Sequence, residues 1–270
     1  MTCWVNGQPA DSLALAARGL AYGDGLFETM RVRDGRIDWL DLHLQRLLHG
    51  CQRLQIPSQA QLLRSEIEAF ASRQTEGVCK LILTRGDGQR GYGLPQPASP
   101  RRILMAAPLP VWPDRNATQG VRLFPCQTRL AIQPLLAGLK HLNRLEQVLA
   151  RAEWSDADYA EGLLLDTSGR VIEGVFSNLF FIRDGQLLTP DLSGSGVAGI
   201  MRQRILQLAG QLAVPVEVRD IVAGELQDMD EAFTCNSLYG IWPVRECSGR
   251  HWPVGPLTLR LQQTLNRQDS

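Results

Sequence analysis

The sequence contains almost no lysine. Its 28 basic residues include only Lys80 and Lys140, and all the others are arginine. Arginine can replace lysine in most ion pairs, but it cannot form a Schiff base with an aldehyde. A lysine that persists in such a sequence is therefore a candidate for amine chemistry, although two incidental lysines left by codon preference would look the same.

The sequence also lacks a net charge, a long apolar run and clustered metal ligands. A formal net charge of zero gives no electrostatic footprint for nucleic acid. No run reaches the ~18 apolar residues of a membrane span, and the start MTCWVNGQPADS does not have the pattern of a signal peptide. The six cysteines form no CxxC pair and the four histidines are dispersed. We therefore expect a cytoplasmic protein with free thiols, no metal site, and no nucleic-acid or membrane partner.

Apolar periodicity and turn residues predict short strands and two helices in the first part of the chain. Asp34-Gly35 predicts the turn of a β-hairpin over residues 25–40. Pro57 ends a helix that begins at about Asp41, and Ser58 is the expected cap of the next. The remaining expectations are a helix up to Arg73 and strands over residues 3–8, 78–84 and 102–107.

A stretch rich in proline and polar residues, 108–118, predicts a linker between a smaller N-terminal domain, 1–107, and a larger C-terminal domain, 119–270. The second domain is expected to combine antiparallel strands with helices, so the fold class is α+β, or mixed α/β. The expected elements are a helix that begins just after Lys140, a meander over 161–189, helices over 199–212 and 256–266, and strands over 232–236 and 241–245.

Residues Gly86–Gly91 match the dinucleotide-binding pattern G-x-G-x-x-G. That site requires the glycines to open a helix whose N-terminus faces a pyrophosphate. Here prolines at 95, 97 and 100 follow, so no helix can begin and the dinucleotide interpretation fails. We expect a loop whose Arg90 and Tyr92, with Arg85 as a further possibility, reach a substrate.

The two lysines differ in their surroundings. Lys80 lies in the middle of an expected strand, where a long charged side chain usually extends to solvent. The segment 140–149, KHLNRLEQVL, instead resembles the Schiff-base segment of the aminodeoxychorismate lyases, members of the fold-type-IV pyridoxal-phosphate family with the D-amino-acid and branched-chain aminotransferases. Four other segments carry the resemblance and occur along this chain in the same order as in the family. They are 22–29 (YGDGLFET), 43–47 (HLQRL), 172–180 (IEGVFSNLF) and 199–202 (GIMR).

The resemblance implies a two-domain homodimer with pyridoxal 5'-phosphate as cofactor and Lys140 as its Schiff-base lysine and catalytic base. Such a lysine must lose its proton near neutral pH, although its free pKa is about 10.4. A carboxylate, here Glu173, keeps the pyridine nitrogen protonated. A helix N-terminus and an arginine suit the phosphate. The implied cofactor-binding residues are Lys140, Arg46, Glu173, Asn178, Ile200, Met201 and Asn236, although many relatives carry threonine at the position of Asn236.

The implied reaction is the conversion of 4-amino-4-deoxychorismate to p-aminobenzoate and pyruvate. A substrate with two carboxylates would suit Arg90 and Tyr92. One alternative is a D-amino-acid or branched-chain aminotransferase, which would share the fold residues but not the lyase-like segment at Lys140. A second alternative is a protein that binds the cofactor without catalysis.

Overall fold

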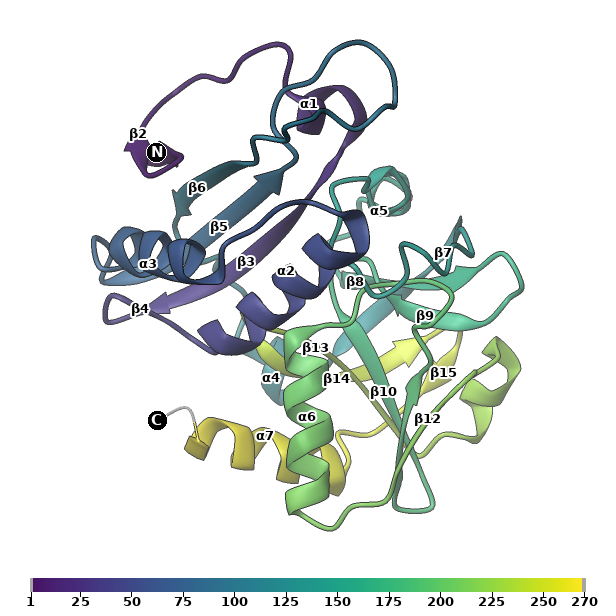
Figure 1. The fold of residues 1–270 in the computed structure, drawn as a ribbon. Helices are drawn as coiled ribbons and strands as arrows, with labels where there is room; N and C mark the ends of the chain where they lie inside the picture. Colours follow the sequence, from purple (N-terminus) through teal and green to yellow (C-terminus); the bar gives the residue numbers. More distant parts are fainter. Residues whose placement is uncertain (1, 269–270) are drawn as a thin grey trace. The chain divides into compact units, whose positions relative to one another are not determined.

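A computed structural model describes residues 2–268, and every statement on elements concerns this range. The chain divides into two compact units (Figure 1). The first comprises residues 1–110 and 139–143, and the second comprises 111–138 and 144–270. The change from one unit to the other at Pro110 falls inside the predicted linker. The return of residues 139–143 to the first unit was not indicated by the sequence.

The first unit is built on an antiparallel sheet in the order β2-β1-β6-β5-β3-β4. Its strands are β1 (Cys3–Val5), β2 (Gln8–Pro9), β3 (Gly25–Arg33), β4 (Arg36–Ile37), β5 (Glu76–Thr84) and β6 (Arg101–Ala107). The predicted hairpin is confirmed, because β3 pairs with β4 across Asp34 and Gly35, which both have positive φ.

Helices α2 (Leu40–Leu54) and α3 (Ala60–Ala71) pack against this sheet, and α1 (Arg18–Tyr22) precedes β3 (Figure 1). The apolar stripe predicted for α2 is buried, with Leu44, Leu47 and Cys51 in the core. The cap predicted for α3 is wrong. Its N-cap residue is Gln59, and no side chain among the described residues caps it.

The second unit contains a mixed sheet in the order β12-β11-β10-β13-β14-β7-β8-β9, with β15 beside β14. Its strands are β7 (Val121–Leu130), β8 (Tyr159–Asp166), β9 (Val171–Gly174), β10 (Asn178–Arg183), β11 (Gln186–Pro190), β12 (Val216–Arg219), β13 (Glu231–Asn236), β14 (Gly240–Cys247) and β15 (Arg250–His251). The two strands β13 and β14 appear where they were predicted. The meander is found only in part: β8 pairs with β9 and β10 with β11, but the stretch predicted as one strand over 170–182 is divided into β9 and β10, which are not neighbours in the sheet. The pairs β7–β8, β7–β14 and β11–β12 are parallel, so the sheet is not purely antiparallel.

The helices of this unit are α4 (Arg115–Thr118), α5 (Leu145–Arg151), α6 (Ile200–Gln211), α7 (Pro256–Gln268) and the short 3-10 helix η1 (Ala223–Asp228). Helices α6 and α7 appear where apolar periodicity predicted them. The cores of the unit are formed by aromatic and branched side chains, among them Phe181, Trp242 and Trp252 in one cluster. Every cysteine is a free thiol.

Candidate active site

Lys140 lies in an extended segment at the edge of β3, not at the start of a helix. The N–H of Phe27 donates to the carbonyl oxygen of Lys140 at 2.9 Å, and Leu142 donates to that of Gly25 at 3.0 Å. Because cross-strand neighbours project from the same face of a sheet, Lys140 lies on the side of Phe27, and its Nζ is 4.4 Å from the centre of that ring. Backbone pairing with β3 therefore positions the amine.

The helix that was expected just after Lys140 begins only at Leu145, so that prediction is wrong at its start. The apolar residues of 142–152 do have helical spacing, but they lie in different environments. Leu142 is half-buried beside β3, whereas Leu145, Val148 and Leu149 are 75%, 60% and 60% exposed on α5. Periodicity detects a shared apolar face and cannot tell which neighbour each residue meets.

Lys80, interpreted from the sequence as a lysine that extends to solvent, lies close to the same aromatic ring. It comes from β5, opposite Thr29, and its Nζ is 5.5 Å from the centre of the Phe27 ring. The two lysines of the chain thus flank one phenylalanine from strands on either side of β3. The sequence held no signal for this, because the two residues are sixty positions apart.

Arg46 belongs to a buried charged cluster on α2 and β3. Its guanidinium donates two hydrogen bonds to the Glu28 carboxylate, at 2.8 and 2.5 Å, and His43 Nδ1 lies 2.6 Å from the same carboxylate. Burial alone would raise the pKa of Glu28, but the Arg46 charge and the His43 hydrogen bond outweigh it and hold the pKa at about 2. Burial lowers the pKa of His43, so a neutral imidazole donates its Nδ1–H to Glu28. The cluster fixes the orientation of the guanidinium.

Arg85 is not available to a substrate, which corrects the expectation that it could act as a clamp. It is 4% exposed, and its guanidinium donates to both oxygens of Asp24 and to the carbonyl oxygens of Leu54 and Gln55 at the end of α2. Arg18 donates to Asp24 as well. A partly buried carboxylate between two buried guanidiniums serves the architecture of this unit.

Arg90 and Tyr92 lie in the loop between β5 and β6, and both are exposed. Arg18 anchors this loop, because its guanidinium donates to the carbonyl oxygens of Gly91 and Gly93 at 3.1 and 3.2 Å. The Tyr22 hydroxyl accepts from the N–H of Gly91 at 3.2 Å. The loop therefore has a defined anchor, and the side chains of Arg90 and Tyr92 project from it.

Glu173 and Asn178 bind the backbone of one residue, Val197, in the second unit of the chain. Glu173 accepts from the N–H of Val197 at 2.8 Å, and the Asn178 amide donates to its carbonyl oxygen at 2.9 Å. Glu173 is 4% exposed. Burial lowers the pKa of Arg144, and the negative charge of Glu173 opposes that shift, so the two charges act on each other.

The segment that follows Val197 leads into the N-terminus of α6, where Gly199 is the N-cap residue and no side chain of the described residues caps the helix. Ile200 and Met201 are buried, at 2% and 1% exposure, and as the first residues of the helix their backbone N–H groups have no partner within it. Gly199 is required here, since a Cβ at that position would lie 2.0 Å from Asn178 Oδ1. This helix start is suited to an anion.

The Asn236 side chain closes a turn at the end of β13. Its Oδ1 accepts from the N–H groups of Leu238 and Tyr239 at 2.9 and 3.0 Å, and its Nδ2 donates to the carbonyl oxygen of Phe176 at 3.4 Å. Asn236 therefore orders the backbone of two loops as well as being a predicted phosphate contact.

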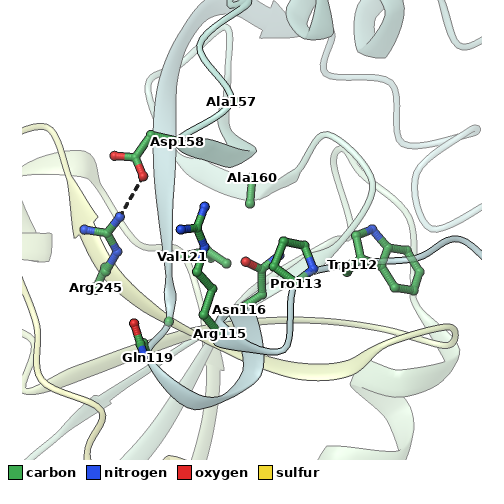
Figure 2. Close-up of a pocket in the computed structure, with 11 residues that line it drawn as sticks. Trp112, Pro113, Arg115, Asn116, Gln119, Val121, Ala157, Asp158, Ala160 and Arg245 are labelled. Carbon is green, nitrogen blue, oxygen red and sulfur yellow. Dashed lines mark hydrogen bonds and ion pairs between the residues drawn. The ribbon is translucent and has the colours of Figure 1, made fainter.

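A cavity of about 260 Å³ lies elsewhere in the second unit, lined in part by Trp112, Arg115 and Val121. Figure 2 shows the ion pair between Asp158 and Arg245, 3.0 Å apart, on one side of it and Trp112 on the other. None of the predicted site residues lines it, so it does not locate the chemistry. Within residues 2–268 no His, Cys, Asp and Glu side chains gather as a metal-binding group, and no helix is long and apolar enough to cross a membrane.

Comparisons with known proteins agree with the features above. The family model for class IV aminotransferases matches residues 25–247. An aminodeoxychorismate lyase from Vibrio harveyi is 38% identical over 97% of this chain and 99% of its own length. The crystal structure of 4-amino-4-deoxychorismate lyase from Pseudomonas aeruginosa is 58% identical, with a TM-score of 0.97 and 98% of each chain covered.

The crystal structure of the branched-chain amino acid aminotransferase from Escherichia coli is 26% identical, with a TM-score of 0.85, and covers 98% of this chain and 93% of its own. The predicted fold class and the predicted resemblance are thereby confirmed. Because the family model covers residues 25–247 and the relative from Vibrio harveyi is 38% identical over 97% of this chain, the chain belongs to the class IV aminotransferase family.

Proposed function

We propose that this chain is a pyridoxal-phosphate-dependent lyase that converts 4-amino-4-deoxychorismate to p-aminobenzoate and pyruvate. The observation that carries the proposal is the similarity over nearly the whole chain to proteins named as aminodeoxychorismate lyases, at 38% and 58% identity. The aminotransferases share the fold at lower identity, 26% for the enzyme from Escherichia coli. The fold does not separate the two reactions, since one fold hosts many activities.

The residues of the candidate site fit the proposed cofactor. Pyridoxal phosphate supplies an aldehyde that forms a Schiff base with an amine, and a protonated ring that withdraws electrons from the bound substrate. Lys140 offers the amine beside the apolar ring of Phe27, at 4.4 Å. The buried carboxylate of Glu173 can hold the proton on a pyridine nitrogen, and the uncapped start of α6 can accept a phosphate.

Each residue then has a defined task. Lys140 would hold the cofactor through its amine, and the same amine would take the proton from the amine-bearing ring carbon of the substrate. Glu173 keeps the pyridine nitrogen protonated. Arg46, oriented by its two hydrogen bonds to Glu28, provides charge for the phosphate. In the second unit the N–H groups of Ile200 and Met201 are suited to a phosphate, and Asn178 and Asn236 order the adjoining backbone.

A coupled assay tests the reaction. Supplied with chorismate, ammonia and a synthase that makes aminodeoxychorismate, the protein should release p-aminobenzoate and pyruvate in equal amounts. Arg90→Ala should raise the KM for this dicarboxylate by about ten- to a hundredfold, which corresponds to the loss of a charge-assisted hydrogen bond of about 1.5–3 kcal/mol. Arg36→Ala, which removes an exposed arginine from β4, is the matched control and should leave the KM unchanged.

Three results would contradict these expectations. An unchanged KM in Arg90→Ala would remove Arg90 from substrate binding while leaving the reaction intact. Rapid amino transfer between D-alanine and 2-oxoglutarate, with aminodeoxychorismate left untouched, would instead establish an aminotransferase. Absorbance from bound cofactor with neither reaction would indicate a binding protein without catalysis.

The proposed assembly is a homodimer, and the exposed side of α5 supports it. Leu145, Val148 and Leu149 lie three and four residues apart on one helical face and are at least 60% exposed. Val148→Asp should shift the sedimentation coefficient at micromolar concentration toward that of a monomer, because it would place a charge in an apolar interface. Val218→Asp, at a 48% exposed valine of β12, is the control. A wild type that sediments as an active monomer would refute the dimer.

The proposed compartment is the cytoplasm. The six free cysteines support it, since thiols are maintained there in a reduced state. Burial raises the pKa of several of them, that of Cys79 to about 12, so they are poor nucleophiles and serve as apolar packing groups.

A further inference from the structure

Glu161 is a fully buried carboxylate to which the sequence assigned no role. It lies in β8 with 0% of its surface exposed. One oxygen accepts from the N–H groups of Gly162 and Val175 at 2.8 and 2.9 Å, and the other accepts from the N–H of Phe176 at 3.4 Å and the hydroxyl of Ser177 at 2.7 Å. Burial raises the pKa of Glu161 to about 7, although these hydrogen bonds oppose the shift. A buried acid held only by uncharged donors is costly for folding and calls for an explanation.

Three of the four donors belong to one tight turn, residues 174–177, which joins β9 to β10. The turn is closed by the N–H of Gly174, which donates to the carbonyl oxygen of Ser177 at 2.8 Å. A Cβ on Gly174 would lie 2.3 Å from Ser177 Oγ and 2.8 Å from the carboxyl carbon of Glu161. The turn and the carboxylate are therefore packed so closely that only glycine fits between them.

The residues at the two ends of this turn are Glu173 and Asn178. Both bind the backbone of Val197: Glu173 accepts from its N–H, and the Asn178 amide donates to its carbonyl oxygen. Three residues further along the chain, Ile200 begins α6. A continuous series of contacts thus runs from Glu161 through the turn to the carboxylate proposed for the pyridine nitrogen and to the helix start proposed for the phosphate.

We propose that Glu161 is a positioning residue that holds the 174–177 turn in shape and thereby sets the geometry with which Glu173 and the start of α6 bind the cofactor. The inference rests on the proposed function for the identity of that cofactor. It extends to the aminotransferase alternative as well, because it concerns cofactor binding and not the reaction that follows.

Glu161→Gln tests this role with little change in volume. The amide replaces one acceptor oxygen with an N–H donor, which then faces the donors of Phe176 or Val175. The dissociation constant of pyridoxal phosphate should rise about ten- to a hundredfold, the range found when a residue that supports a ligand-binding residue is removed. The absorbance spectrum of the bound cofactor should change in the same direction as in Glu173→Gln, which serves as the positive reference.

Glu231→Gln is the matched control. Glu231 is another buried carboxylate of this unit, 5% exposed, and it accepts from the N–H groups of Leu257 and Thr258 and from the Thr258 hydroxyl at 3.1, 2.8 and 2.6 Å. It holds the start of α7. Its replacement should lower the melting temperature as Glu161→Gln does, but leave the cofactor spectrum and dissociation constant as in the wild type.

Equal effects of the two substitutions on cofactor binding would overturn the proposal, since Glu161 would then be a structural residue only. If Glu161→Gln does not fold, Ser177→Ala decides, because it removes one donor and keeps the carboxylate. A severalfold larger dissociation constant of pyridoxal phosphate in Ser177→Ala supports the role, and an unchanged dissociation constant rejects it. A wild type that binds no pyridoxal phosphate would overturn both this role and the proposed function, whereas binding by the wild type with normal binding by the variants overturns the role alone.

Discussion

Lys140→Ala should abolish the visible absorbance of the bound cofactor and lower turnover by at least about 10²–10⁴-fold, the contribution of a general base. The amine of Lys140, beside β3, is the group that the proposed cofactor needs. Lys80 is the one other lysine in the sequence, so it is the side chain that could replace Lys140 in this role. Lys140→Arg should give the same result, because arginine retains the charge but cannot form a Schiff base. Absorbance titration with pyridoxal phosphate measures the effect.

The position of Lys80 makes this a demanding test. Its Nζ is 5.5 Å from the ring of Phe27, and that of Lys140 is 4.4 Å from the same ring, so proximity alone does not distinguish them. Lys80→Arg should retain the absorbance. Borohydride reduction of the wild type, followed by peptide mass spectrometry, should place the modification on Lys140. A modification on Lys80, or a colourless wild type, would reject the assignment.

Arg46→Ala should lower the free energy of unfolding of the cofactor-free protein by about 3–5 kcal/mol, because it leaves Glu28 as a buried carboxylate without its cation. Glu28 is 1% exposed and receives two hydrogen bonds from Arg46. The control is Arg64→Ala, which removes exposed ion pairs with Asp41 and Glu68 on the surface of the same unit. A pair of that kind contributes only about 0–1 kcal/mol. Urea unfolding without cofactor measures both values.

The role of Arg46 in phosphate binding can be separated from its role in stability. The double variant Glu28→Gln/Arg46→Met removes both charges, so it should recover most of the lost stability. It should still bind pyridoxal phosphate weakly, since the cation for the phosphate is absent. Wild-type affinity in the double variant would show that Arg46 acts only through folding.

The ion pair of Glu28 and Arg46 also predicts how the free energy of unfolding depends on pH. The pKa of Glu28 falls from an ordinary value of 4.5 to about 2 on folding, so the folded state retains the ionised form to lower pH than the unfolded chain does. The stabilisation is complete above pH 4.5 and is lost as the pH falls toward 2. In Glu28→Gln this part of the acid dependence should disappear, which urea unfolding at a series of pH values would reveal.

Much of the fold was predictable because local rules decide it. Asp34-Gly35 can adopt the left-handed backbone of a tight hairpin turn, and the turn forms where it was predicted. Leucine at helical spacing marks the face of α2 that packs against the sheet. Prolines after Gly86–Gly91 exclude the helix that a dinucleotide site requires, and no helix begins there.

Other features were wrong or missed because they depend on contacts between distant positions. Leu142 looked like the first apolar residue of a helix, yet its N–H bonds to Gly25, so the segment extends and α5 begins at Leu145. The sequence left Arg85 as a possible substrate contact, but its guanidinium is hydrogen-bonded to Asp24 and to two carbonyl oxygens. Glu161 received no role from the sequence, since nothing near it in sequence shows that residues 175–177 supply its donors.

The sequence by itself determined the chemistry that this protein has available. The scarcity of lysine and the segment around one of the two lysines predict Lys140 as the Schiff-base lysine. The order of short motifs indicated the family, because side-chain type and spacing can be read directly from the sequence. The tertiary structure decided the surroundings of those groups. It placed the amines of Lys140 and Lys80 near the ring of Phe27 and buried Glu28 in an ion pair with Arg46. It also connected Glu161 to Glu173 through the 174–177 turn. Burial and charge pairing depend on which distant residues meet, and only the folded chain specifies that.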